Sequence, residues 1–136
     1  MDFSTSMTVA ASGLKAQSDR MKTIAENIAN ANSAASTTGG DPYRRKVPTM
    51  TSSFDRELNA EVVKSGKPVA DSSEFRLQYD PGNPLADKQG YVKMPNVNSL
   101  VEIMDMREAQ RSYEADLSMM DATKTMLSRT VDLLKK

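Results

Sequence analysis

The sequence predicts a mainly α-helical protein in which long N- and C-terminal helices pair as an antiparallel, coiled-coil-like hairpin, with a small β- and loop-rich insert between them. Three observations predict this fold class. Apolar residues recur every seven positions near each end of the 136-residue chain, and the middle holds all six prolines and five of the six glycines. Helix interiors disfavour both residue types. We therefore divide the chain into an N-terminal helix region (1–33), an insert (34–98) and a C-terminal helix region (99–136).

The N-terminal helix is predicted from about Ser4 to Asn32. Ser4 or Ser6 is expected to cap its start, because a hydroxyl oxygen accepts bonds from free N–H groups there. Asn30 and Asn32 are expected to supply the left-handed turn that ends it. Two rows of residues with a spacing of seven form its seam. These rows are Met7, Leu14, Met21 and Ile28, and then Ala10, Gln17, Ile24 and Ala31.

The C-terminal helix is predicted from about Ser99 to the end of the chain. Ser99 and Glu102 have capping-box spacing and follow Pro95 closely. The seam is interrupted by Gln110 and Lys124, and polar seam residues lower stability while they specify register. Such helices would be more stable if partners covered both faces, as a polymer provides. The rows are Met106, Tyr113, Met120, Leu127 and Leu134, and then Ile103, Gln110, Leu117, Lys124 and Val131.

The insert carries strand and turn signals. Residues 75–79 alternate apolar and polar, which predicts a strand. The run Asp80–Pro84 is dense in turn formers. A short strand is expected to begin near Gly90 and to stop at Pro95. Residues 54–63 are predicted as a further strand that could contain some helix.

Composition excludes several classes of function. The chain has no Cys and no His, which removes thiol nucleophiles, Ser-His-Asp chemistry and the usual zinc ligands. Its formal net charge is zero, so it provides no positive electrostatic field that would attract nucleic acid. The same neutrality allows copies of the chain to associate closely, because they do not repel one another. No apolar run is long enough to span a membrane. The start lacks the features of a cleaved signal peptide, so export would need another route.

Three polar clusters could suggest chemistry, and each has a simpler interpretation. Asp80–Asp87 holds two carboxylates, but its prolines and the missing final Glu favour a structured turn over a calcium loop. The basic run Arg44–Lys46 could suggest RNA, although a solvated or subunit-facing cluster is favoured. Asp71 and Glu74 could form an acid–base pair, although a solvated loop is favoured. We therefore predict no catalytic residue, no metal and no cofactor.

Three segments resemble a known family. The runs Ala11–Gln17 and Ile24–Asn32 resemble the signature of flagellar rod and hook proteins. The run Glu108–Glu114 resembles the terminal helix shared by that family. The block from Asp80 to Asp87, with Gly90–Val97 after it, is similar to the short, proximal rod members of the family.

The resemblance implies a structural subunit of the bacterial flagellar basal-body rod. Such subunits are exported unfolded by the flagellar type III export apparatus, without a cleaved signal. They join copies of themselves and other rod proteins in a helical tube that surrounds the export channel and transmits torque across the periplasm. The resemblance implies neither nucleic-acid binding nor membrane insertion. The alternative from another class is a soluble coiled-coil adaptor or secretion chaperone that binds a partner helix in a groove.

Two sets of residues follow as candidate sites. The first is expected to pack against other subunits, and Arg111 is expected to make lateral contacts beside it. The second shapes the turn after the first helix and the loop that positions the insert. The packing set is Met7, Leu14, Met21, Ile28, Met106, Tyr113, Leu117, Met120, Leu127 and Leu134. The family motif loop set is Asn27, Asn30, Asn32, Pro81, Gly82, Asn83, Pro84, Gly90, Tyr91 and Pro95.

Overall fold

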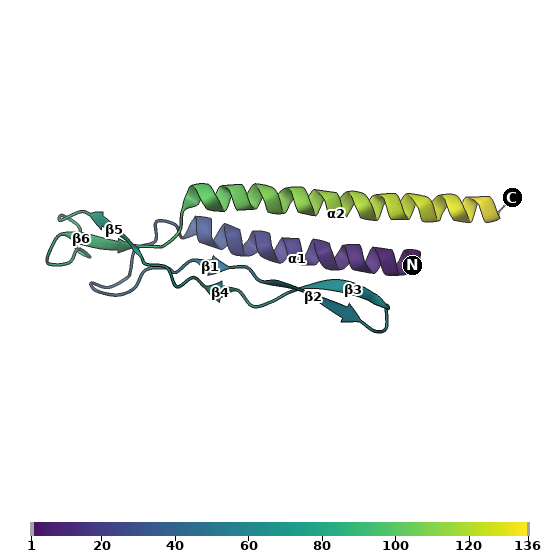
Figure 1. Ribbon diagram of the computed structural model, residues 1–136. Coiled ribbons are helices and arrows are strands. Elements are labelled where there is room, and N and C mark those ends of the chain that lie inside the picture. The colour runs from purple at the N-terminus through teal and green to yellow at the C-terminus, as the bar shows by residue number, and fades with distance from the viewer. Residues whose placement is uncertain (1, 136) are drawn as a thin grey trace. The chain divides into compact units, whose positions relative to one another are not determined.

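The computed structural model describes residues 2–135, so the outermost residues of the two predicted helix regions, 1 and 136, lie outside it. Two long helices enclose six short strands in the sequence, which confirms the predicted element order (Figure 1). Neither helix is long and apolar enough, over the described residues, to cross a membrane. The elements are α1 (Phe3–Ala29), β1 (Lys46–Val47), β2 (Met50–Asp55), β3 (Ala60–Ser65), β4 (Val69–Ala70), β5 (Arg76–Tyr79), β6 (Tyr91–Met94) and α2 (Ser99–Leu134).

The chain forms two compact units. Unit 1 contains residues 49–67 and, among the described residues, 2–21 and 107–135. Unit 2 contains residues 22–48 and 68–106. Each helix therefore contributes to both units, and the hairpin of β2 and β3 belongs to unit 1.

Helix α1 begins one residue earlier than the sequence predicts. The N–H of Ser6 bonds the carbonyl of Asp2 at 3.0 Å, so Asp2 occupies the position before the helix. The prediction that Ser4 or Ser6 caps the helix was wrong, since both lie within its first turns. Asp is among the most favourable residues at an N-cap.

The end of α1 differs from the left-handed turn expected at Asn30 and Asn32. Among the described residues, Asn59 is the one non-glycine with positive φ. Asn30 instead donates its side-chain amide to the carbonyl of Glu26 at 2.8 Å. The N–H groups of Ala31 and Ser33 then bond carbonyls three residues earlier, which is the tighter 3₁₀ pattern common at helix ends.

Helix α2 is capped by Asn98 rather than by the predicted Ser99 and Glu102 pair. The N–H groups of Leu100 and Val101 donate to Asn98 Oδ1 at 3.1 and 3.4 Å. The Asn98 carbonyl also accepts the Glu102 N–H at 3.0 Å. The Glu102 side chain is therefore not part of the cap, and it is buried inside unit 2.

The hairpin of unit 1 corrects the prediction of one strand over residues 54–63. Strands β2 and β3 pair antiparallel from Met50 opposite Ser65 to Asp55 opposite Ala60. The chain reverses between them because Asp55 Oδ1 accepts bonds from the N–H groups of residues 57 and 58. Asn59 completes the turn at φ 48°. Short Asp and Asn side chains stabilise such turns.

Unit 2 contains two small antiparallel sheets, β1 with β4 and β5 with β6. Strands β5 and β6 confirm the strands predicted near residues 75–79 and 90–94. They pair from Arg76 opposite Met94 to Tyr79 opposite Tyr91. The predicted turn at residues 80–84 is confirmed, with the N–H of Asn83 bonding the carbonyl of Asp80. Buried Pro95 follows β6, as expected for a residue that cannot extend a strand ladder.

Candidate functional site

A buried polar network in unit 2 joins the end of α1 to the start of α2. Asn27 and Glu102 are 0% and 1% exposed, and Asn27 Nδ2 donates to Glu102 Oε2 at 3.1 Å. An isolated buried carboxylate is costly, so it requires donors or a cation nearby. Asn27 is the first of these donors.

The side-chain amide of Asn27 also bonds the backbone of β1, as a neighbouring strand would. Its Nδ2 donates to the carbonyl of Lys46 at 2.8 Å, and its Oδ1 accepts the N–H of Lys46 at 2.9 Å. The hydroxyl of Tyr43 donates to the same Oδ1 at 2.9 Å. Burial is the main cause that raises the pKa of Tyr43 above 10.0, so this hydroxyl keeps its proton in neutral solution. The polar atoms of the Asn27 amide are thus all bonded.

Arg45 supplies the positive charge of the network. Its Nε donates a hydrogen bond to Glu102 Oε1, and its Nη1 lies 3.4 Å from Asp71 Oδ2. Its Nη2 lies 3.8 Å from Asp105 Oδ2. Burial alone would lower the pKa of Arg45, but the bonds and charges of Glu102 and Asp71 outweigh it and raise the pKa. Arg45 therefore stays charged and neutralises Glu102.

The basic run Arg44–Lys46 is not a free cluster, because each of its side chains has partners within the chain. The Arg44 guanidinium lies 4.2 Å from the centre of the Phe75 ring and donates to two backbone carbonyls. Lys46 Nζ pairs with Glu26 at 3.0 Å. The two arginines are half-buried and bonded within the chain, so they are not freely solvated, while the prediction that the run faces another subunit stays a prediction. Arg45 pairs with carboxylates of the same chain, and Arg44 lies over the face of the Phe75 ring.

Asp71 is part of this network and not of an acid–base pair with Glu74. The Ser73 N–H donates to Asp71 Oδ1 at 2.9 Å. The backbone and then the side chain of Ser73 are the main causes that lower the pKa of Asp71, and Arg45 adds to them. Glu74 is exposed. The ionised Asp71 therefore serves to order residues 71–73 beside Arg45.

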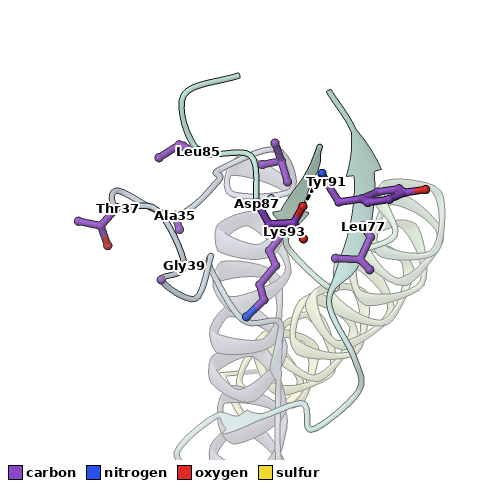
Figure 2. Close-up of a pocket in the computed structure, with 10 residues that line it drawn as sticks. Ala35, Thr37, Gly39, Leu77, Leu85, Asp87, Tyr91 and Lys93 are labelled. Atoms are coloured by element: carbon purple, nitrogen blue, oxygen red, sulfur yellow. Dashed lines mark hydrogen bonds between the residues drawn. The ribbon is translucent and has the colours of Figure 1, made fainter. Parts of the chain in front are cut away.

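The predicted motif loop also lies in unit 2, beside a small hollow of about 70 Å³. Figure 2 shows Asp87 against the N–H of Tyr91, a bond of 2.9 Å, and shows the Tyr91 ring turned away from the hollow. Lys93 lines the hollow and pairs with Asp41 at 3.5 Å. Asp87 also accepts the N–H of Gln89, so its carboxylate serves the turn. Within residues 2–135, no three acidic side chains form a metal-binding group.

Motif residues differ in how strongly the fold uses them. Asn27, Gly90 and Pro95 are buried, and Asn83 Oδ1 accepts the N–H of Leu85 at 3.0 Å. The Tyr91 ring packs edge-on against Tyr79 at 5.2 Å. The remaining exposed motif residues are Asn32, Pro81, Gly82 and Pro84.

Sequence reasoning missed Tyr43, Arg45 and Glu102 as members of one site. Glu102 carried a signal, but its spacing from Ser99 suggested a cap. Arg45 stood in a basic run that suggested a surface. No local pattern relates residue 45 to residue 102, so the pairing could not be read before the fold was known.

None of the predicted packing residues is fully buried within the chain. Leu117, Leu127 and Leu134 are 44%, 39% and 83% exposed, and the other seven are half-buried. The second row of the first seam does contribute two buried side chains, Ile24 and Ala31. The buried residues of the two helices are Ala16, Thr23, Ile24 and Asn27 in α1, and Glu102, Ala109 and Thr123 in α2.

Unit 1 contains an open groove of about 630 Å³. Val9, Ala10 and Gly13 of α1 line it together with Met119 and Met126 of α2. Asp116 also lines it, beside Gly13. The groove is therefore largely apolar and carries one carboxylate.

Two family models match the ends of the chain that contain these sites. Residues 7–34 match the model described as flagella basal body rod protein, and residues 88–133 match the model described as flagellar basal body rod FlgEFG protein C-terminal. The flagellar basal-body rod protein FlgC of Agrobacterium fabrum is 50% identical over 133 residues, which cover 98% of this chain and 96% of that relative.

The chain belongs to the FlgC family of flagellar basal-body rod proteins. FlgC of Aquifex aeolicus is 39% identical over 99% of both chains, and FlgC of Bacillus subtilis is 39% identical over 96% of this chain and 97% of its own. Membership of the FlgC family confirms the predicted role as a structural rod subunit and not an enzyme. Asn27 and Glu102 each lie within a matched segment, and Arg45 lies between the segments.

Proposed function

We propose that this FlgC-family subunit joins copies of itself and other rod proteins in a helical tube that surrounds the export channel and transmits torque across the periplasm. The observation that carries this proposal is an exposed apolar ridge on α2. Leu117, Leu127 and Val131 are 44%, 39% and 42% exposed. They lie toward one helix face, because the steps of 10 and 4 residues between them are sums of the three-, four- and seven-residue steps of a heptad seam. Removing apolar surface from water favours association, so a neighbour that covers this ridge would stabilise the assembly.

Helices α1 and α2 are proposed to pair antiparallel. In unit 1, Gly13 lies against Asp116, and Arg20 contacts Glu108 at 3.5 Å. The number on α2 falls as the number on α1 rises, which is the order an antiparallel pair requires. In unit 2, the end of α1 contacts the start of α2 through Asn27 and Glu102. The α1 members of these contacts are spaced by seven, as in a coiled-coil seam.

Delivery by the flagellar type III export apparatus agrees with the chemistry of the chain. The sequence has no Cys, so no disulfide restricts its unfolding before it threads through a channel. The folded subunit would then gain stability when neighbours at the growing end cover the α2 ridge, because binding to the folded state shifts the folding equilibrium by mass action.

Torque transmission requires a stiff subunit, and the network of unit 2 supplies stiffness. Arg45 connects Glu102 with Asp71 and Asp105, while Asn27 bonds the backbone of Lys46. Satisfied buried networks rigidify the segments that they join. A load applied to α2 would therefore be shared with α1 and β1.

Electron cryomicroscopy of isolated basal bodies tests this proposal. The bacterium's own copy is deleted, and a version with an added epitope tag restores it. We expect the tag, and density for two antiparallel helices, in the rod wall around the channel. A soluble adaptor or chaperone would instead remain outside the basal body as a discrete complex. A tagged protein that restores swimming but is absent from purified rods would contradict the proposal.

A further inference from the structure

We infer that the groove of unit 1 binds the exposed α2 ridge of a second copy of this chain, so that Lys124 of the second copy pairs with Asp116 in the groove. This inference rests on the proposed function and deepens it, because it names the partner and the contact. The ridge extends Leu117, Leu127 and Val131 to the full set Leu117, Met120, Lys124, Leu127, Val131 and Leu134, which are spaced alternately by three and four residues. Met120 is half-buried and the other five are exposed.

The groove offers apolar walls and unsatisfied acceptors. Met119 and Met126 form the α2 wall and are 64% and 52% exposed, while Ala10 and Gly13 form part of the α1 wall. The small α1 side chains leave room for another helix to approach, since side-chain size at the contact controls the distance between helices. Thioether side chains adapt to the shape of a partner.

Asp116 places one negative charge in this apolar surface. Its Oδ2 lies 2.8 Å from the point where a side chain at Gly13 would begin, so the carboxylate lies against the bare backbone of α1. None of the ion pairs among residues 2–135 involves Asp116. Gln17 also lines the groove, and its buried Oε1 has no hydrogen-bond donor among the described residues. Both groups are acceptors, so the groove selects an occupant that brings a donor with positive charge.

The ridge has the complementary chemistry. Lys124 is its one charged residue, is exposed, and joins none of the ion pairs among the described residues. Leu117 and Val131 lie seven residues before and after it and are both more than 40% exposed. A single cation within an apolar ridge matches a single anion within an apolar groove. Such a pair specifies the register of two helices, which apolar packing alone does not.

A second copy of the chain can occupy the groove because every copy carries both the groove and the ridge. The groove and the ridge are different surfaces of one chain, so a contact between them is heterologous and leaves one of each surface free. Repeating such a contact produces a closed ring or an open helical array, and not a two-fold dimer. The helical array is the arrangement required of a subunit in a tube.

A charge exchange tests the contact in cells that carry variants in place of the wild-type protein. We expect Asp116→Lys and Lys124→Asp each to reduce the number of assembled rods at least tenfold. The double variant restores the opposite charges and should recover at least half of the wild-type number. Asp132→Lys and Arg129→Asp make the same changes at exposed α2 positions outside the ridge and groove, and should behave as wild type. Single variants equal to these controls, or a double variant no better than the singles, would overturn the inference.

Cross-linking provides a second test that does not depend on charge reversal. The chain has no natural Cys, so an introduced thiol is unique. One tagged copy carries Asp116→Cys, a second copy with another tag carries Lys124→Cys, and basal bodies from the same cells receive a short bismaleimide. We expect a product of twice the subunit mass with both tags. Rods that contain both copies but yield no such product, or only a product with a different protein, would overturn this inference and leave the rod assignment intact. Absence of both copies from basal bodies would instead contradict the proposed function.

Discussion

Asn27 donates its side-chain amide to Glu102 over 3.1 Å, although 75 residues separate the two in sequence and both side chains are fully buried. The contact links the last turns of α1 to the first turn of α2 within unit 2. Since the same amide bonds the backbone of Lys46 twice, one side chain positions three segments of the chain.

Replacing Asn27 with Asp tests this arrangement with almost no change in shape. The variant replaces a donor with an acceptor that faces the Lys46 carbonyl and the Glu102 carboxylate. We expect a loss of about 2–4 kcal/mol in the free energy of unfolding, measured by urea titration with circular dichroism. The control Asn32→Asp changes an exposed residue and should alter stability by less than about 0.5 kcal/mol. Equal effects of the two changes would contradict the role of Asn27.

Replacing Arg45 with Met should leave Glu102 as an uncompensated buried charge and cost about 3–5 kcal/mol. Adding Glu102→Leu removes that charge, so the double variant should be at least about 1 kcal/mol more stable than Arg45→Met alone. Arg56→Met, at an exposed position of the β2–β3 turn, serves as the control. Additive effects in the double-mutant cycle would show that the two side chains are not coupled.

The pH dependence of stability should contain a contribution from Asp71. Its pKa in the folded protein is lower than the ordinary 3.8, chiefly because Ser73 donates to the carboxylate. The folded state therefore favours the ionised form, so this stabilisation is present above pH 3.8 and is lost as the pH falls through the lower folded pKa. Asp71→Asn should destabilise the protein at pH 7, and its difference from wild type should shrink toward pH 2 in acid unfolding series. A difference that stays constant across this range would contradict the assignment.

Gly90 and Gly82 form a matched pair in the motif loop. Gly90 has φ +87°, and a Cβ there would lie 2.9 Å from Tyr79 Cε2, so Gly90→Ala should cost about 1–3 kcal/mol. A Cβ at Gly82 would lie 3.8 Å from Asp80 Oδ1, and its φ is not positive. Gly82→Ala should therefore change stability by less than about 1 kcal/mol. Thermal unfolding compares the two variants, and a greater loss for Gly82→Ala would refute the explanation.

Leu117→Asp tests whether the α2 ridge is used in assembly. Leu117 is 44% exposed in the single chain, so the change should alter the stability of the free subunit by less than about 1 kcal/mol. It should abolish rods and swimming, because a charge would be buried at the subunit contact. Ser118→Asp introduces the same charge at the next, exposed position and should permit swimming. Normal rods with Leu117→Asp would exclude Leu117 from the packing surface.

Sequence patterns predicted the elements well because each signal is local. Heptad rows predicted both helices, alternation predicted β5, and the turn at residues 80–84 followed from its prolines and Gly82. The residues that cap the helices were predicted less well. Each helix start has both a serine and an Asp or Asn that can cap it, and the structure uses Asp2 and Asn98. The hairpin of β2 and β3 was missed because its turn at Asp55–Asn59 lacks Gly and Pro.

The sequence by itself determined the helical ends, the irregular middle and, through resemblance, the rod family. The tertiary structure alone decided that Glu102 faces inward to Asn27 and Arg45, and that Asp116 lies against Gly13. The physical reason is the range of the interactions. Backbone preferences and hydrophobic periods act over a few residues, whereas a buried charge finds its partners only when distant segments are brought together.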